Sequence, residues 1–118
     1  MDRTFTLAEA RALLPDLLAR ADAIIRLRAG LAEARHALHS GAELVALPEV
    51  KSMEAHLQEA VDWFAGHGIQ LKGIAPLIAD FPGQLDGSSV LLCWLEGETA
   101  LTWYHRAESG FLGRRPLP

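Results

Sequence analysis

Chemically capable side chains gather in the last third of the chain. His105 has two ring nitrogens that can bind a metal or carry a proton, and the acids Asp80 and Asp86 precede it. Imidazole and carboxylate are ligands that divalent metals accept, and the same groups serve in acid–base catalysis. The sequence therefore suggests His105, Asp80 and Asp86 as ligands of a divalent metal or as the centre of a small enzyme-like site.

A second polar group comes from Glu98 and Arg114. If residues 110–115 double back along the preceding hairpin, Arg114 or Arg115 can reach Glu96 or Glu98. A surface ion pair of this kind contributes at most about 1 kcal/mol. Beside a pocket or an exposed edge, however, the same pair could bind a small polar ligand or a partner.

Lys72 and Cys93 lie in apolar surroundings. Lysine with apolar neighbours can be partly buried, although its stem usually lets the ammonium group reach water. We consider Lys72 together with Asp80, Glu98 and Arg114 as contacts for a ligand or partner. Cys93 is the single cysteine, which excludes an internal disulfide and a zinc site built from several cysteines. No cofactor is expected other than a divalent metal.

Known catalytic patterns do not occur in the sequence. It contains no Ser-His-Asp order, phosphate loop, dinucleotide fingerprint or His-Glu-x-x-His helix. The sequence therefore names no substrate or reaction, and it favours a protein without catalytic activity.

These residues need a β scaffold to bring them together. Short apolar runs separated by turn residues predict strands at 69–72, 77–81, 90–95 and 100–105. A turn at 96–99 would join the last two strands and pair Leu95 with Ala100 and Val90 with His105.

This register places Trp103 and His105 on one face of the sheet, together with Trp94. It places Cys93 and Tyr104 on the other face. A three-residue loop would shift the pairing and regroup these side chains. The tail after residue 115 is not expected to continue a regular strand, because prolines interrupt it.

Helices are predicted before residue 67. Thr6 and Glu9 form a capping box at the start of the first helix. Pro15 predicts a helix of about two turns followed by a kink or a restart, and Gly30 permits another break. A second helix is predicted from Pro48 to about Ala65, which makes a helical hairpin.

Apolar side chains follow a four-three spacing along the first helical element, with Arg28 and Arg35 interrupting the stripe. From Leu14 to Leu38 the stripe spans about 36 Å, whereas the second helix offers only about 27 Å. Part of the stripe therefore needs another cover, and the two arginines suggest that its distal half is more exposed or pairs with acids of another chain. We predict a homodimer through the long helix and favour a self-associating interaction or regulatory module.

Composition limits the remaining alternatives. The 118 residues carry 11 basic and 15 acidic side chains, for a formal net charge of −4. This balance argues against nucleic-acid binding, and no apolar run is long enough for a membrane span. We expect a cytoplasmic, single-domain α+β protein over residues 1–118, with a helical hairpin in 1–66 packed against a small antiparallel sheet of three or four strands in 67–118.

Several spaced motifs occur in the same order in a known family, among them Asp80-Phe81-Pro82, Leu92-Cys93-Trp94, Trp103-Tyr104-His105 and Gly113-Arg114. Through them the chain resembles, over nearly its whole length, the domain of unknown function 2203 (DUF2203) family. The resemblance implies a small prokaryotic cytoplasmic protein with a long helical element, a compact β region and no assigned activity. It marks five polar positions: Lys72, Asp80, Glu98, His105 and Arg114. At residues 104–106 this chain has Tyr-His-Arg, where family members often carry Trp-His-Glu.

Overall fold

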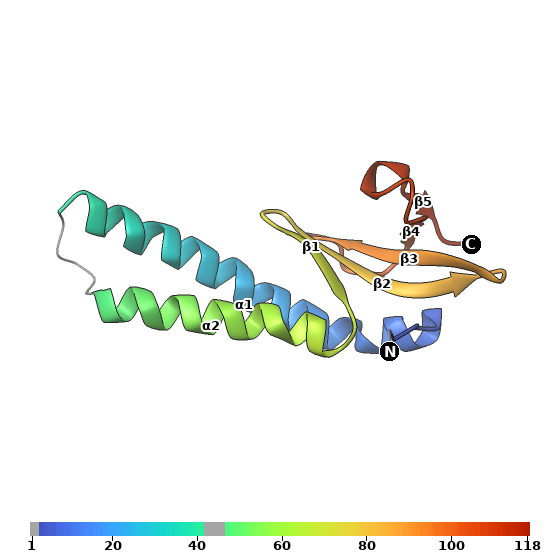
Figure 1. The fold of residues 1–118 in the computed structure, drawn as a ribbon, viewed down its shortest axis with the longest axis horizontal. Helices are drawn as coiled ribbons and strands as arrows, with labels where there is room; N and C mark the ends of the chain where they lie inside the picture. The colour runs from blue at the N-terminus through green and yellow to red at the C-terminus, as the bar shows by residue number, and fades with distance from the viewer. Residues whose placement is uncertain (1–2, 42–46) are drawn as a thin grey trace.

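The computed structural model describes residues 3–41 and 47–118. Two helices, α1 (Leu7–His39) and α2 (Leu47–Gly66), form the predicted hairpin, and an antiparallel sheet follows them. In the described residues the sheet has five strands, each paired with the next in the chain: β1 (Gln70–Ile74), β2 (Leu77–Leu85), β3 (Ser88–Leu95), β4 (Trp103–His105) and β5 (Arg115–Pro116). The predicted α+β class is confirmed, and the hairpin extends beyond the sheet at one end (Figure 1).

Helix α1 begins at the predicted capping box. The Thr6 hydroxyl accepts from the Glu9 amide at 3.0 Å, and the Glu9 carboxylate accepts from the Thr6 amide at 2.8 Å. The predicted restart at Pro15 is wrong, because one helix runs through Pro15 and Gly30 to His39. Burial of one face on both sides of the proline offsets the backbone hydrogen bond that the proline removes.

Most of the apolar stripe of α1 is covered within the chain. Its positions Ala10, Leu14, Leu17, Ala21 and Ile24 lie in the main core. Farther along, Leu31 and Ala34 pack against Val50 of α2 in a second cluster. The sheet and α2 therefore cover the stripe as far as Ala34, whereas Leu38 at its end is 37% exposed.

The two arginines of the stripe also find acids inside the chain. Arg28 pairs with Glu96 at 2.6 Å, and Arg35 pairs with Glu54 at 2.9 Å. Neither of these contacts requires acids from a second chain, which corrects the alternative drawn from the sequence.

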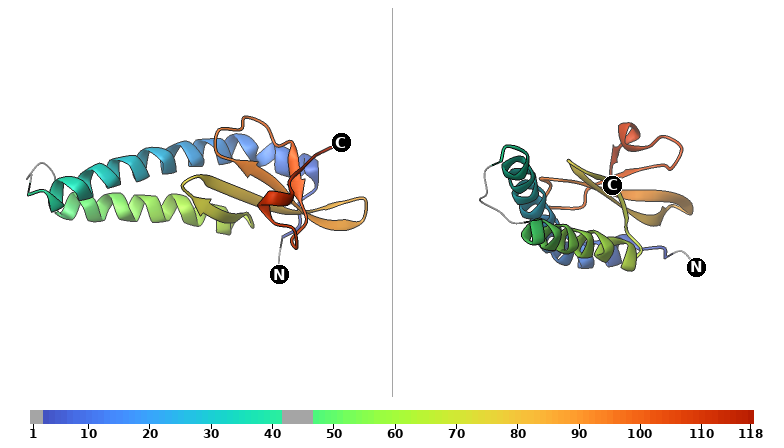
Figure 2. Two further views of the ribbon diagram at one scale, coloured as in Figure 1. Left: turned by 90° about the horizontal axis from the view of Figure 1, so that it is seen from above. Right: turned by 60° about the vertical axis from the view of Figure 1, so that its left-hand side comes forward.

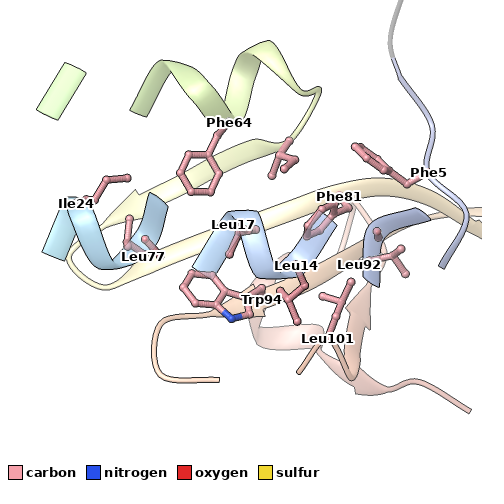
Figure 3. Packing of buried hydrophobic residues seen from close by; sticks show 14 of the residues in the cluster. Phe5, Leu14, Leu17, Ile24, Phe64, Leu77, Phe81, Leu92, Trp94 and Leu101 are labelled. Atoms are coloured by element: carbon pink, nitrogen blue, oxygen red, sulfur yellow. The ribbon is translucent and has the colours of Figure 1, made fainter. Parts of the chain in front are cut away.

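The main core lies between the helices and one face of the sheet (Figure 3). Alternate residues of β2 and β3 point toward the helices, as the two-residue period of a strand requires. These inward residues pack with Phe64 of α2 and with Leu101 from the β3–β4 connection, and they are Leu77, Ala79, Phe81, Val90, Leu92 and Trp94.

The opposite face of the sheet lies beneath the C-terminal segment. After β4 the chain turns through η1 (Phe111–Gly113) and returns as β5 beside β4. Figures 1 and 2 show this red segment on the side of the sheet that faces away from the helices. The short strand β5 corrects the expectation that the proline-rich tail cannot join the sheet. As an edge strand of two residues, it tolerates Pro116.

The β3–β4 register differs by one residue from the predicted one. His105 pairs with Leu91 and Trp103 pairs with Cys93. The chain between β3 and β4 is a seven-residue connection rather than a tight turn, and it buries Leu101 in the core. A shift of one residue moves side chains to the other face, so His105 and Cys93 share a face after all.

Among the described residues, no helix combines the length and hydropathy that crossing a bilayer requires.

Candidate functional site

Three buried side chains meet on the face of the sheet opposite the helices. They are Asp80 on β2, Cys93 on β3 and His105 on β4, and their exposed fractions are 1%, 0% and 2%. One ligand atom of each residue lies within 4.8 Å of the other two. We call these three residues the Asp-Cys-His cluster.

Strand pairing explains this meeting. Asp80 lies directly opposite Cys93 in the β2–β3 register. On β4, Trp103 is opposite Cys93, and His105 is the next residue of that strand on the same face. Side chains on neighbouring strands and one face are natural contacts in a sheet, so the cluster is a direct product of the register.

The structure brings together two of the three predicted metal ligands. Asp80 and His105 touch, whereas Asp86 lies in the β2–β3 turn with a positive φ of 51°. Six residues separate Asp80 from Asp86, which corresponds to about 20 Å along a strand. Asp86 therefore lies outside the cluster. The third side chain beside Asp80 and His105 is Cys93, which replaces Asp86 in the predicted ligand set.

His105 is held at both ring nitrogens. Nδ1 lies 3.0 Å from the backbone oxygen of Arg106. Because a carbonyl oxygen only accepts, Nδ1 carries a proton and donates it. Nε2 lies 3.2 and 3.1 Å from the two carboxylate oxygens of Asp80. An imidazole lone pair facing a carboxylate is repulsive, so a proton or a metal ion has to lie between Nε2 and Asp80.

Cys93 contributes a fully buried thiol. Desolvation by burial and the neighbouring Asp80 together raise the pKa of Cys93 from 9.0 to about 12, although Arg114 opposes the shift. The nucleophilic form of cysteine is the thiolate. Without a metal, this thiol is therefore a poor nucleophile at neutral pH, and the cluster does not resemble the centre of a cysteine hydrolase.

Lys72 lies at the outer side of the cluster. Its Nζ is 3.6 Å from Oδ2 of Asp80, and its side chain is 47% exposed. The β1–β2 register shifts between Leu71 and Gly73, which leaves Lys72 at an irregularity of the edge strand. The predicted candidates Lys72, Asp80 and His105 thus lie in one place.

Glu98 and Arg114 form the predicted ion pair at 2.7 Å. Arg114 also donates to the backbone oxygen of Cys93 at 3.1 Å. Its guanidinium carbon lies 5.0 Å from the ring centre of Trp103 and 5.1 Å from that of Phe111. These contacts fasten the C-terminal segment over the sheet beside the cluster.

The Glu98 carboxylate also accepts from the Leu95 amide at 2.7 Å, and its backbone oxygen accepts from the Trp94 indole at 2.8 Å. Glu98 therefore organises the β3–β4 connection. Since Arg114 is 13% exposed and Glu98 is 22% exposed, the geometry favours a structural role for this pair. Glu96, the alternative partner, binds Arg28 instead.

Cys93 is the member of the cluster that sequence reasoning missed. Its lone occurrence excluded only a zinc site built from several cysteines, and the predicted register placed it away from His105. The signal that could have found it is the alternation of Leu91, Cys93 and Leu95 opposite Asp80, combined with a longer β3–β4 connection.

Comparison with known proteins supplies a family and no activity. No curated protein and no solved structure matches the chain. One family model matches residues 3–117, nearly the whole sequence, and its description is an uncharacterized conserved protein. The match includes the Asp-Cys-His cluster, Lys72 and the Glu98–Arg114 pair, and the chain therefore belongs to the DUF2203 family.

Proposed function

We propose that this protein binds a divalent metal ion, with zinc as the best fit, through Asp80, Cys93 and His105. The observation that carries the proposal is the meeting of three buried ligand atoms within 4.8 Å. They represent carboxylate oxygen, thiolate sulfur and imidazole nitrogen. Zinc accepts all three donor types, whereas calcium and magnesium prefer oxygen alone.

Distances support zinc. Zinc binds oxygen and nitrogen at about 2.0–2.2 Å and sulfur at about 2.3 Å, so tetrahedral ligand atoms lie about 3.5 Å apart. Movements of the side chains by about 1 Å would bring the cluster to these distances. The ion would take the position between Nε2 of His105 and the Asp80 carboxylate, which a proton otherwise bridges.

The surroundings of His105 favour metal binding as well. Histidines that bind metals generally donate their other ring N–H to a backbone carbonyl or a carboxylate. The Nδ1 of His105 already makes such a bond to the backbone of Arg106. Three protein ligands leave a fourth position of a tetrahedral ion for water or a ligand, which is typical of catalytic zinc sites and not of structural ones.

A direct test is metal analysis of protein purified without chelator or affinity-tag metal. We expect about one zinc per chain, and a cobalt-substituted protein should show the absorption of a sulfur-to-cobalt charge transfer. This band reports on Cys93 in the wild-type chain, so it does not depend on a variant that folds. Absence of both zinc and the cobalt–sulfur band would overturn the proposal.

Variants distinguish the cluster from other acids. Cys93→Ser should abolish the cobalt–sulfur band, and His105→Gln should weaken metal binding. Asp86→Asn is the matched control, because Asp86 was a predicted ligand and lies outside the cluster. If Asp86→Asn loses metal as fully as His105→Gln does, the ligand assignment is wrong. Circular dichroism of each variant identifies any that fail to fold.

Self-association as a non-catalytic module stays a second prediction. Two exposed apolar side chains support it, Leu38 at 37% and Leu47 at 57% exposed, and both lie at the end of the hairpin far from the sheet. A homodimer would therefore use this end of the helices. Molar mass from light scattering tests it, with Leu38→Ser and Leu47→Ser expected to give monomers; a wild-type monomer at micromolar concentration contradicts it.

A further inference from the structure

Arg114 lies beside Cys93, the sulfur ligand of the proposed metal site. Its Nη2 donates to the backbone oxygen of Cys93 at 3.1 Å and to the carboxylate of Glu98 at 2.7 Å. Burial is the main cause of the raised pKa of Cys93, and the charge of Arg114 opposes that shift because the guanidinium lies near the thiol. Arg114 is therefore close to both the backbone and the side chain of this ligand.

One donor of Arg114 has no acceptor in the described part of the chain. This donor is Nε, whose atom is buried and forms no hydrogen bond with any described residue. Buried N–H groups in folded proteins are nearly always hydrogen-bonded, because burial removes the water that would otherwise accept from them. The orphaned Nε–H therefore indicates an acceptor that the metal-free chain does not supply.

The guanidinium of Arg114 is held in place by two acceptors and two rings. The acceptors are those of Nη2, at Glu98 and at the backbone of Cys93. The guanidinium carbon lies 5.0 Å from the ring centre of Trp103 and 5.1 Å from that of Phe111. Because a guanidinium is planar and rigid, these contacts also fix Nε. Nε therefore stays close to Cys93 and does not turn to solvent.

We infer that Nε of Arg114 donates a hydrogen bond to the Cys93 sulfur when a metal ion is bound, which makes Arg114 a positioning residue of the metal site. This inference rests on the proposed metal site. Metal-bound sulfur carries the charge of a thiolate, so it accepts hydrogen bonds better than a neutral thiol does. The carboxylate of Glu98 pairs with the guanidinium at 2.7 Å. Arg114 therefore adds a donor without adding net positive charge beside the ion.

The other two ligands already have polar partners outside the cluster. His105 donates from Nδ1 to the backbone oxygen of Arg106 at 3.0 Å, and Nζ of Lys72 lies 3.6 Å from Asp80. Such outer partners orient metal ligands and tune the bound ion. A hydrogen bond from Arg114 gives the third ligand, Cys93, an equivalent partner.

The first test uses the full wild-type chain loaded with an NMR-active isotope of cadmium, a soft metal that accepts thiolate and imidazole ligands. A proton in a hydrogen bond to a metal-bound sulfur shows scalar coupling to the metal nucleus. We expect this coupling at the Nε proton of Arg114. The measurement needs no variant, so its result does not depend on whether a variant folds.

Variants of the cobalt-substituted chain give a second readout. A hydrogen bond lowers the energy of the sulfur electrons, so its loss should move the cobalt–sulfur band to longer wavelength. Arg114→Met, fully loaded with cobalt, should show this shift. Arg28→Met is the matched control, because Arg28 forms a comparable ion pair with Glu96 at 2.6 Å but lies on α1 and not beside Cys93.

The outcomes separate this inference from the proposed function. A chain that binds neither cadmium nor cobalt overturns the proposed metal site, and the role of Arg114 with it. A chain that binds cadmium without coupling to the Nε proton of Arg114 overturns the inference alone. An equal band shift in Arg28→Met also overturns it, because loss of any ion pair would then explain the shift. If Arg114→Met does not fold or holds no cobalt, the cadmium coupling decides.

Discussion

Replacing Glu96 with glutamine removes the charge that ties α1 to the sheet. Both carboxylate oxygens of Glu96 accept from the guanidinium of Arg28 at 2.6 Å, and one of them also accepts from the Leu77 amide at 2.9 Å. The two side chains are 22% and 26% exposed. The pair is therefore largely shielded from water, and its two-pronged geometry is the strong form of this contact.

The expected loss follows from the acidity of Glu96. The hydrogen bond from Arg28, followed by that from Leu77, lowers the pKa of Glu96 from 4.5 to about 2. At 1.36 kcal/mol per pKa unit this corresponds to about 3 kcal/mol, and partial exposure reduces it to about 2 kcal/mol. Because the folded pKa is the lower one, this stability is present above pH 4.5 and is lost as the pH falls toward 2.

Urea unfolding at a series of pH values, with chelator present to exclude metal effects, measures this contribution. We expect Glu96→Gln to lower the free energy of unfolding by about 2 kcal/mol at pH 7 and by much less near pH 2. Glu108→Gln is the control, because Glu108 is exposed and forms no ion pair with the described residues. An equal loss for Glu96→Gln at both pH values, or none at pH 7, would refute the reasoning.

Three further predictions follow from burial and backbone geometry. In metal-free protein at pH 8, a thiol reagent should modify Cys93 at least about a thousandfold more slowly than in urea, because its pKa is about 12 and it is buried; comparable rates contradict this. Leu17→Ala should cost about 3 kcal/mol in urea unfolding, whereas Leu112→Ala, at a 97% exposed position, should cost under about 0.5 kcal/mol. Pro15→Ala should raise the free energy of unfolding by about 1–3 kcal/mol, since an exposed proline inside α1 removes a helix hydrogen bond; a lower melting temperature would count against this.

Local patterns in the sequence determined most of the fold. The capping box at Thr6 and Glu9, the helical spacing and the apolar runs identified both helices and the order of the first four strands. These features act between residues close in the chain, so a sequence contains them directly. The ion pair of Glu98 with Arg114 was also predictable, because the glycine at 110 allows the chain to return toward the hairpin.

The sequence did not determine the candidate site, because one residue of strand register decides it. The predicted tight turn placed Cys93 and His105 on opposite faces, whereas the longer connection observed places them together beside Asp80. Likewise, Pro15 suggested a broken helix, but packing against the sheet and α2 on both sides of the proline keeps α1 continuous. Local propensity therefore predicts which segments form helices and strands. Tertiary contacts, such as those that bury Leu101, select the register of the strands and keep α1 continuous. They can do so because burial contributes more free energy than a single turn or proline costs.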